Sequence, residues 1–339
     1  MQVIKINRSA SADILKAISI FGVVYIHSIF SVPFSDISLN WISPIFRFCV
    51  PIFIMLWAFF AEKSISKHNG EKGYLAIRFY NLLVPFIFWS TIYFFLKVEW
   101  KSLTFTQIFT KHWSGYGWSG QYYFLLLFQF IAIFSLLRRL ALYLTKHIIL
   151  LTISSVLFYF VVTYSPIFLI NSVAKIGDRL FIYWIPYVLF GIIWARTGYN
   201  KIVKLPIILG MTLPVIIPLE IYIFHPAVIK FSPYVIPSVF ISSIALLLAF
   251  MSNDLKMHGR YTIFTRAVSL LAKNTLGIFC INPLIIKLFR PLFLSASINL
   301  NFFGYSLLLP IAFTIITIVL CIFLIFILKK LKLGMLVLS

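Results

Sequence analysis

Charged residues, and acidic ones above all, are what this chain has least of. Only 11% of its 339 residues are charged, and eight acidic residues stand against 29 lysines and arginines. Soluble domains are about a quarter charged and about half apolar, whereas this chain is 62% hydrophobic with a mean hydropathy of +1.02. Water cannot solvate most of such a surface, so we expect bilayer lipid to surround it.

Several catalytic motifs are also missing. The chain has no Walker-type phosphate loop, no GxSxG turn, no HExxH helix and no cluster of Cys or His residues. Its three cysteines, Cys49, Cys280 and Cys321, fall in apolar stretches without the spacing of metal ligands. These absences argue against ATP hydrolysis, serine-hydrolase chemistry and a metal centre.

Long apolar stretches are abundant instead. A helix needs about 20 mostly apolar residues to cross the hydrocarbon core of a bilayer. Stretches of about this length occur at 13–33, 43–61, 79–96, 121–137, 148–165, 180–195, 205–224, 234–251, 268–288 and 304–328. We therefore predict an all-α, polytopic helical membrane bundle with about ten transmembrane helices, forming a single domain over residues 1–339.

The basic residues set the predicted orientation of this bundle. If the N-terminus is inside, most of the 29 lysines and arginines fall in connections on the inner side, as the positive-inside rule requires. We therefore place both termini in the cytoplasm and attribute the net charge of +21 to topology rather than to a nucleic-acid partner. No cleavage site convincingly follows the first stretch, which we expect to be retained as a helix.

The first predicted helix carries three ionisable residues, Asp13, Lys16 and His27. At 100° per residue, Lys16 and His27 differ by roughly 20° and Asp13 lies roughly 40° from His27, so the three share one stripe. Lys16 and His27 are about 16 Å apart along the axis. Ionisable groups within a membrane are expensive and are functional candidates by default. A cation at the cytoplasmic mouth could hold an anion, and a deeper imidazole could act as a general base; a snorkelling lysine, a helix-terminal aspartate and a structural histidine are the alternatives.

The run from Asp13 through Lys16 to His27 resembles the first helix of the acyltransferase-3 family, in which an acidic residue, then Arg or Lys, then ten residues, precede a His. Further stretches resemble later family motifs in the same order: Arg47 to Leu56, the run of Arg78, Pro85 and Trp89, Gln121 to Phe124, Tyr187 to Gly191, and Leu276 to Pro283. The chain departs from the family at Trp57-Ala58, where Ser-Gly is usual, and we expect the bulky ring to lie where helices pack closely. It departs again at Asn282, where a late His is common, which leaves His27 as the single plausible membrane base.

The resemblance implies a membrane O-acyltransferase. Such an enzyme takes an acyl group, often acetyl, from cytoplasmic acyl-CoA and places it on a sugar hydroxyl of a surface polysaccharide, such as lipopolysaccharide, or of its lipid-linked precursor. We predict His27, Asp13 and Lys16 as catalytic residues, and Lys16, Arg47 and Arg78 as contacts for the CoA donor. Predicted contacts for the acceptor are Trp118, Gln121, Tyr122, Tyr123 and Asn282, where aromatic rings could stack on sugars or anchor the protein at the membrane interface.

Two other functions remain open at this point. A transporter or flippase of lipid-linked saccharide also uses intramembrane charges and broken helices, although the two halves of the chain show no clear similarity. A non-catalytic partner in glycan assembly is the second, but it would not need a cation and a base on one stripe. From the resemblance we expect the prokaryotic inner membrane as the location; the oligomeric state stays open.

Overall fold

The computed structural model describes residues 9–31, 41–65, 70–97, 104–111, 115, 117–164, 179–198, 205–228, 234–252, 263–297 and 303–337. Every regular element in these ranges is helical. The α-helices are α1 (Ala10–Ser31), α2 (Ser43–Ile45), α3 (Cys49–Ile65), α4 (Glu71–Lys97), α5 (Phe105–Lys111), α6 (Gln121–Leu144), α7 (Ile148–Tyr164), α9 (Ile185–Thr197), α10 (Ile207–Thr212), α11 (Ile216–Val228), α12 (Pro237–Ser252), α13 (Ile263–Lys273), α14 (Thr275–Ser297) and α15 (Phe303–Lys330). Short 3₁₀ turns are η2 (Phe46–Phe48), η4 (Thr145–His147), η7 (Phe181–Trp184), η9 (Leu213–Val215) and η10 (Gly334–Leu336).

Seven stretches of the described residues are long and apolar enough to cross a membrane. They are Ala10–Phe30, Ser43–Ile65, Glu71–Leu96, Gln121–Tyr164, Ile207–Phe224, Thr275–Leu292 and Leu308–Lys330. The stretch Gln121–Tyr164 is 44 residues long and contains both α6 and α7, and two shorter apolar helices lie at Phe181–Thr197 and Pro237–Ser252. The all-α class is confirmed, whereas the count of about ten spans and the cytoplasmic location of both ends stay predictions.

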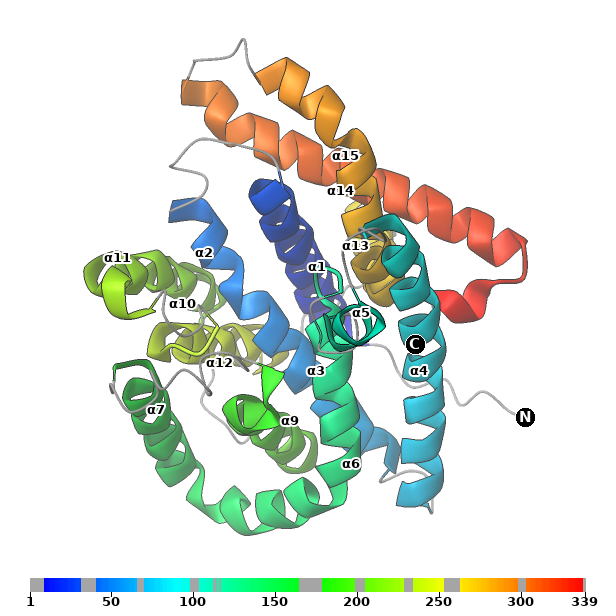
Figure 1. Ribbon diagram of the computed structural model, residues 1–339. Helices are drawn as coiled ribbons and strands as arrows, with labels where there is room; N and C mark the ends of the chain where they lie inside the picture. The colour runs from blue at the N-terminus through cyan, green and yellow to red at the C-terminus, as the bar shows by residue number, and fades with distance from the viewer. Residues whose placement is uncertain are drawn as a thin grey trace.

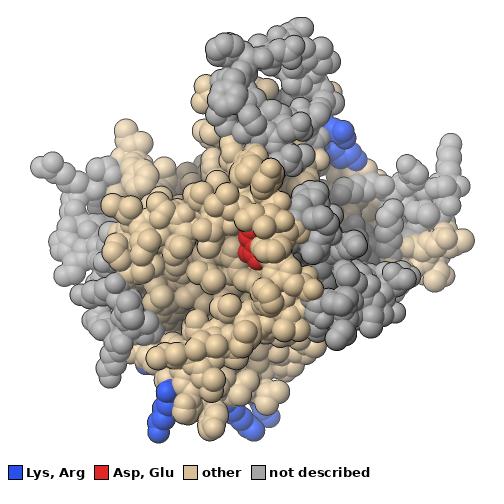
Figure 2. Space-filling model, turned by 90° about the vertical axis from the view of Figure 1, so that its left-hand side faces the viewer, with Lys and Arg blue, Asp and Glu red and all other residues tan. Residues whose placement is uncertain are grey.

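The outer face of the bundle is apolar. Large side chains that are more than half exposed include Leu142, Ile149, Ile208, Ile223 and Phe326. On the face that Figure 2 shows, the described residues are mostly uncharged, with an acidic patch near the centre and basic side chains toward the margins. A surface of this kind is stable against lipid and not against water, so the chain is a multi-pass membrane protein.

Helices α1 and α3 form the centre of the bundle (Figure 1). Helix α1 packs against α3, α12, α13, α14 and α15, and α3 packs most extensively against α9. A Cβ atom placed on Gly191 of α9 would lie 2.4 Å from the Met55 carbonyl oxygen and 2.9 Å from the Ala58 Cβ. Only glycine allows this approach, so Ala58 rather than Trp57 makes the close helix contact.

One expected helix is divided in the structure. The stretch predicted at 268–288 falls into α13 and α14, which meet at Asn274. The Asn274 amide side chain donates to the Leu270 carbonyl at 2.7 Å and accepts from the Lys329 ammonium at 2.6 Å. These bonds satisfy backbone and side-chain groups where the chain changes direction. The break allows α13 to lie beside α1 while α14 continues into the bundle.

Candidate active site

A cavity of about 410 Å³ lies between α1, α3, α4, α6, α13 and α14. Five residues of α1 follow one another at helical spacing: Asp13, Lys16, Ile20 and Val23 line the cavity, and His27 continues the series four residues later. The spacing of three, four, three and four residues keeps the side chains on one face of a helix. The part of the predicted stripe from Asp13 to Val23 therefore faces the cavity, and His27 lies on the same face of α1 beyond the cavity lining.

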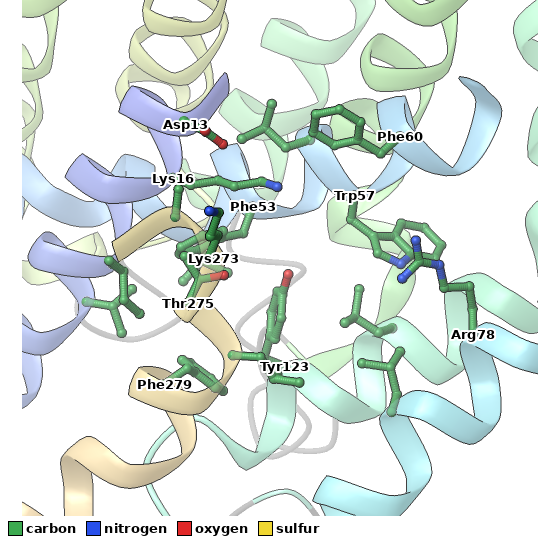
Figure 3. Close-up of a pocket in the computed structure, with 18 of the residues that line it drawn as sticks. Asp13, Lys16, Phe53, Trp57, Phe60, Arg78, Tyr123, Lys273, Thr275 and Phe279 are labelled. Atoms are coloured by element: carbon green, nitrogen blue, oxygen red, sulfur yellow. The ribbon is translucent and has the colours of Figure 1, made fainter. Parts of the chain in front are cut away.

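Three cations surround the cavity. Lys16 and Lys273 lie on one side of it and Arg78 on the other, with the Tyr123 side chain directed between them (Figure 3). The Lys16 ammonium lies 4.6 Å from the centre of the Phe60 ring, and the Arg78 guanidinium donates to the Tyr74 hydroxyl at 2.9 Å. Lys16 and Arg78 therefore lie beside aromatic rings of the cavity wall.

His27 is oriented by Asn282 of α14. The two side chains are joined by a hydrogen bond of 2.6 Å between His27 Nδ1 and Asn282 Oδ1. The Asn282 Nδ2 group donates to the carbonyls of Ile278 and Phe279, at 2.9 and 2.8 Å. The amide must therefore keep its oxygen toward the imidazole, since a flipped amide would set its oxygen against two carbonyls. His27 Nδ1 then carries the proton, so Nε2 is the ring nitrogen whose lone pair can act as a base.

Phe279 lies between the His27–Asn282 pair and the cavity. Its ring lines the cavity and lies 6.4 Å from the His27 ring, centre to centre. The ring is 8% exposed, and Trp118, Tyr123 and Phe124 pack around it. A side chain at Gly120 would collide with the Phe279 ring, at 2.5 Å from its Cζ atom. The positive φ of 96° at Gly120 also favours glycine. Gly120 therefore leaves room for the Phe279 ring, which separates the cavity from His27.

The structure separates the other predicted site residues into those near the cavity and those away from it. Trp118 and Gln121 are buried, and both donate to the Ser90 hydroxyl, at 3.3 and 2.9 Å. The Gln121 carbonyl oxygen also accepts from the Gly117 backbone, so its polar groups are occupied within the protein. The predicted role of both residues as acceptor contacts therefore stays a prediction that this arrangement does not favour.

Arg47 and Tyr122 lie outside the cavity lining as well. Arg47 precedes α3 at the end of the α1–α3 pair that is remote from Lys16, with Phe30 and Tyr234 beside it. Tyr122 packs against the hydrophobic core. The Trp57 ring rests on Phe130 and Phe134 of α6, between packed helices as expected, and it also lines the cavity.

Sequence reasoning missed two groups of cavity residues. Lys273 was counted only as an inner basic residue, and the aromatic wall of Phe53, Trp57 and Phe60 was not recognised. The i, i+4, i+7 spacing of this wall is a signal that could have been found. For Lys273 no such signal existed, because its place depends on how α13 packs against α1.

These features define a class: a multi-pass helical membrane protein with an oriented histidine behind a cavity rimmed by cations. The acyltransferase domain family matches residues 9–330, nearly the whole chain. The chain belongs to this family, acyltransferase-3, and is a membrane acyltransferase. No curated protein and no solved structure matches it significantly.

Proposed function

We propose that the protein transfers an acyl group, most simply acetyl, from cytoplasmic acyl-CoA to a sugar hydroxyl of a surface polysaccharide or of its lipid-linked precursor. The observation that carries the proposal is the His27–Asn282 pair, which leaves Nε2 of His27 as a base at the end of the stripe that begins with Lys16. When an acyl group passes from a thioester sulfur to a hydroxyl oxygen, a base of this kind takes up the proton of the attacking hydroxyl.

The cavity suits the donor. Its volume lies within the range of ligand sites, and Lys16, Lys273 and Arg78 offer cations to the phosphates of CoA. The Asp13–Lys16 end of α1 would then face the cytoplasm, where acyl-CoA is made. From Lys16 to His27 the helix rises about 16 Å, which is comparable with an extended pantetheine arm. The thioester would thus arrive near Phe279 and His27.

The chemistry follows from this placement. The acceptor hydroxyl gives its proton to His27 Nε2, and its oxygen attacks the thioester carbonyl. The resulting C–S bond cleavage releases the CoA thiolate, which takes the proton back from the imidazolium. The Tyr123 side chain is directed into the cavity (Figure 3) and is our candidate donor to the developing oxyanion. Attack by Nε2 itself would give an acyl-imidazole that passes the acyl group to the hydroxyl in a second step; both routes use the same atom.

The test compares membranes that contain the wild-type protein, His27→Ala or His147→Ala in equal amounts. His147 is the matched control because it is exposed on η4 and outside the cavity. Labelled acetyl-CoA is supplied, and label is followed into the glycan fraction. General-base catalysis contributes about 100- to 10,000-fold, so His27→Ala should lose at least 100-fold in rate while His147→Ala stays like wild type.

Two results would contradict the proposal. Equal transfer by the wild type and His27→Ala would remove His27 as the base. Absence of transfer by the wild type, in cells whose surface glycan nevertheless depends on the protein, would argue for transport of a saccharide or for a different acyl donor.

A further inference from the structure

Arg47 is a buried cation, and among the residues that the structure describes no carboxylate pairs with it. Its side chain is 9% exposed, and its Nε has no hydrogen-bond partner. The guanidinium carbon lies 4.8 Å from the centre of the Tyr234 ring and 5.4 Å from that of Phe30. Such ring contacts offset only part of the cost of removing a cation from water, so an anion beside this guanidinium would be stabilising.

The described carboxylates are engaged elsewhere. Glu62 pairs with Arg138 and Arg196, and Glu71 also pairs with Arg138. Glu220 accepts from the Tyr164 hydroxyl and from the Ser238 backbone. Asp13 lies with Lys16 on the far side of His27. In the part of the chain that the structure describes, no acidic side chain is therefore positioned to pair with Arg47, and a ligand anion is the alternative.

Two buried serines lie on α2 and α12, the elements that pack against η2, which carries Arg47. Ser43 stands four residues before Arg47, and Ser238 stands four residues after Tyr234. The Oγ atoms of both serines are buried and have no hydrogen-bond partner. Elements η2 and α12, which carry Arg47 and Ser238, pack against each other. A guanidinium together with unpaired hydroxyl donors matches the needs of a phosphate group, which offers several acceptor oxygens.

The position of Arg47 along α1 relates it to the active site. Lys16 contacts Phe60 near the end of α3, whereas Arg47 at the start of α3 contacts Phe30 in the last turn of α1. The two cations therefore lie at opposite ends of the α1–α3 pair. His27 stands between them, three residues before Phe30, or about 5 Å of helix rise. If Lys16 serves the donor, Arg47 lies on the side from which the acceptor approaches.

We propose that Arg47 binds the phosphate or pyrophosphate of the acyl acceptor, which is then a lipid-linked saccharide still held in the membrane rather than a neutral polymer. This inference rests on the function proposed above and names its acceptor class. The sugar next to the pyrophosphate would lie within reach of His27, and the lipid chain would remain in the bilayer beside the exposed Phe30 ring.

The test is a binding measurement that needs no acyl transfer. The full chain is placed in phosphatidylcholine nanodiscs, and its tryptophan fluorescence is titrated with a polyprenyl pyrophosphate, with the matching polyprenol, with inorganic pyrophosphate and with phosphatidylglycerol. The variants are Arg47→Gln, Arg47→Lys, Ser43→Ala and, as the matched control, Arg290→Gln, whose exposed arginine lies on α14. Size-exclusion profiles and thermal melts without ligand establish that each variant is folded.

We expect saturable binding of the polyprenyl pyrophosphate, and weak or undetectable binding of the polyprenol. Loss of a charge-assisted hydrogen bond lowers affinity by about 10- to 100-fold, which we expect for Arg47→Gln. Arg47→Lys should fall between Arg47→Gln and the wild type, because an ammonium keeps the charge without the planar fork. Ser43→Ala should weaken binding by a smaller factor, and Arg290→Gln should bind like the wild type. If Arg47→Gln does not fold, the affinities of Arg47→Lys and Ser43→Ala for the polyprenyl pyrophosphate test the inference instead.

Three results would overturn the inference: wild-type affinity in the folded Arg47 variants, equal binding of polyprenol and polyprenyl pyrophosphate, or equal binding of phosphatidylglycerol, which would assign the site to an ordinary lipid headgroup. Failure of acyl-CoA to act as donor would refute the proposed function but would leave this binding result unchanged, so the two failures are distinguishable.

Discussion

Replacing Asn282 by leucine tests the orientation of His27 most directly. The change keeps the side-chain volume close to that of the amide but removes the oxygen that accepts from His27 Nδ1 at 2.6 Å. The Nδ1 proton then loses its buried partner, and the tautomer with the proton on Nε2 becomes accessible. Leaving one buried polar group unsatisfied costs about 1–3 kcal/mol, which corresponds to a loss of about 5- to 150-fold in the rate of acyl transfer.

The measurement is the rate of transfer from labelled acetyl-CoA in membranes with matched protein amounts. We expect a lower kcat for Asn282→Leu and a nearly unchanged KM for acyl-CoA, because Asn282 does not line the cavity. The change should have no further effect in a His27→Ala background, since it acts through the imidazole. An additive loss in the double variant would refute this reasoning, as would full activity of Asn282→Leu in the presence of His27.

Three further predictions concern binding and stability. Lys273→Gln should raise the KM for acyl-CoA by about 3- to 10-fold with little change in kcat, because an exposed cation contributes about 1 kcal/mol; steady-state rates across donor concentrations check this, and a changed kcat with constant KM would contradict it. Glu62→Gln should lower the free energy of unfolding by about 3 kcal/mol, because two arginines lose a buried carboxylate that they contact at 2.6 and 2.8 Å; thermal melts in detergent are the measurement, and an unchanged midpoint would count against a structural role. Gly191→Val should cost about 1–3 kcal/mol by overpacking against a backbone carbonyl of α3, whereas Gly73→Ala, which meets no atom within 4 Å, should leave the midpoint nearly unchanged.

Much of the fold class could be predicted because it depends on composition. A chain with few charges and many long apolar stretches has few structures open to it other than a helical membrane bundle. The boundaries were less predictable. The break at Asn274 was missed because only three polar residues, Lys273 to Thr275, interrupt an otherwise apolar stretch, and because Lys329 of α15, which bonds Asn274, is distant in the sequence.

The candidate active site, like the fold, could be predicted from the sequence only in part. The stripe of Asp13, Lys16 and His27 was predictable, since it needs only the period of one helix. The interior positions of Trp118 and Gln121 were not, because their partner Ser90 belongs to another helix.

By itself, the sequence determined the solvent of this protein, its helical class and which ionisable groups share the face of α1, because hydropathy and helical period are local properties. Only the tertiary structure decided that Asn282 holds His27 across 255 residues of chain, that Lys273 joins the cavity, and that Arg47 lies at the opposite end from Lys16. These facts depend on which helices become neighbours and how each is rotated, and that is set by packing between residues far apart in the chain.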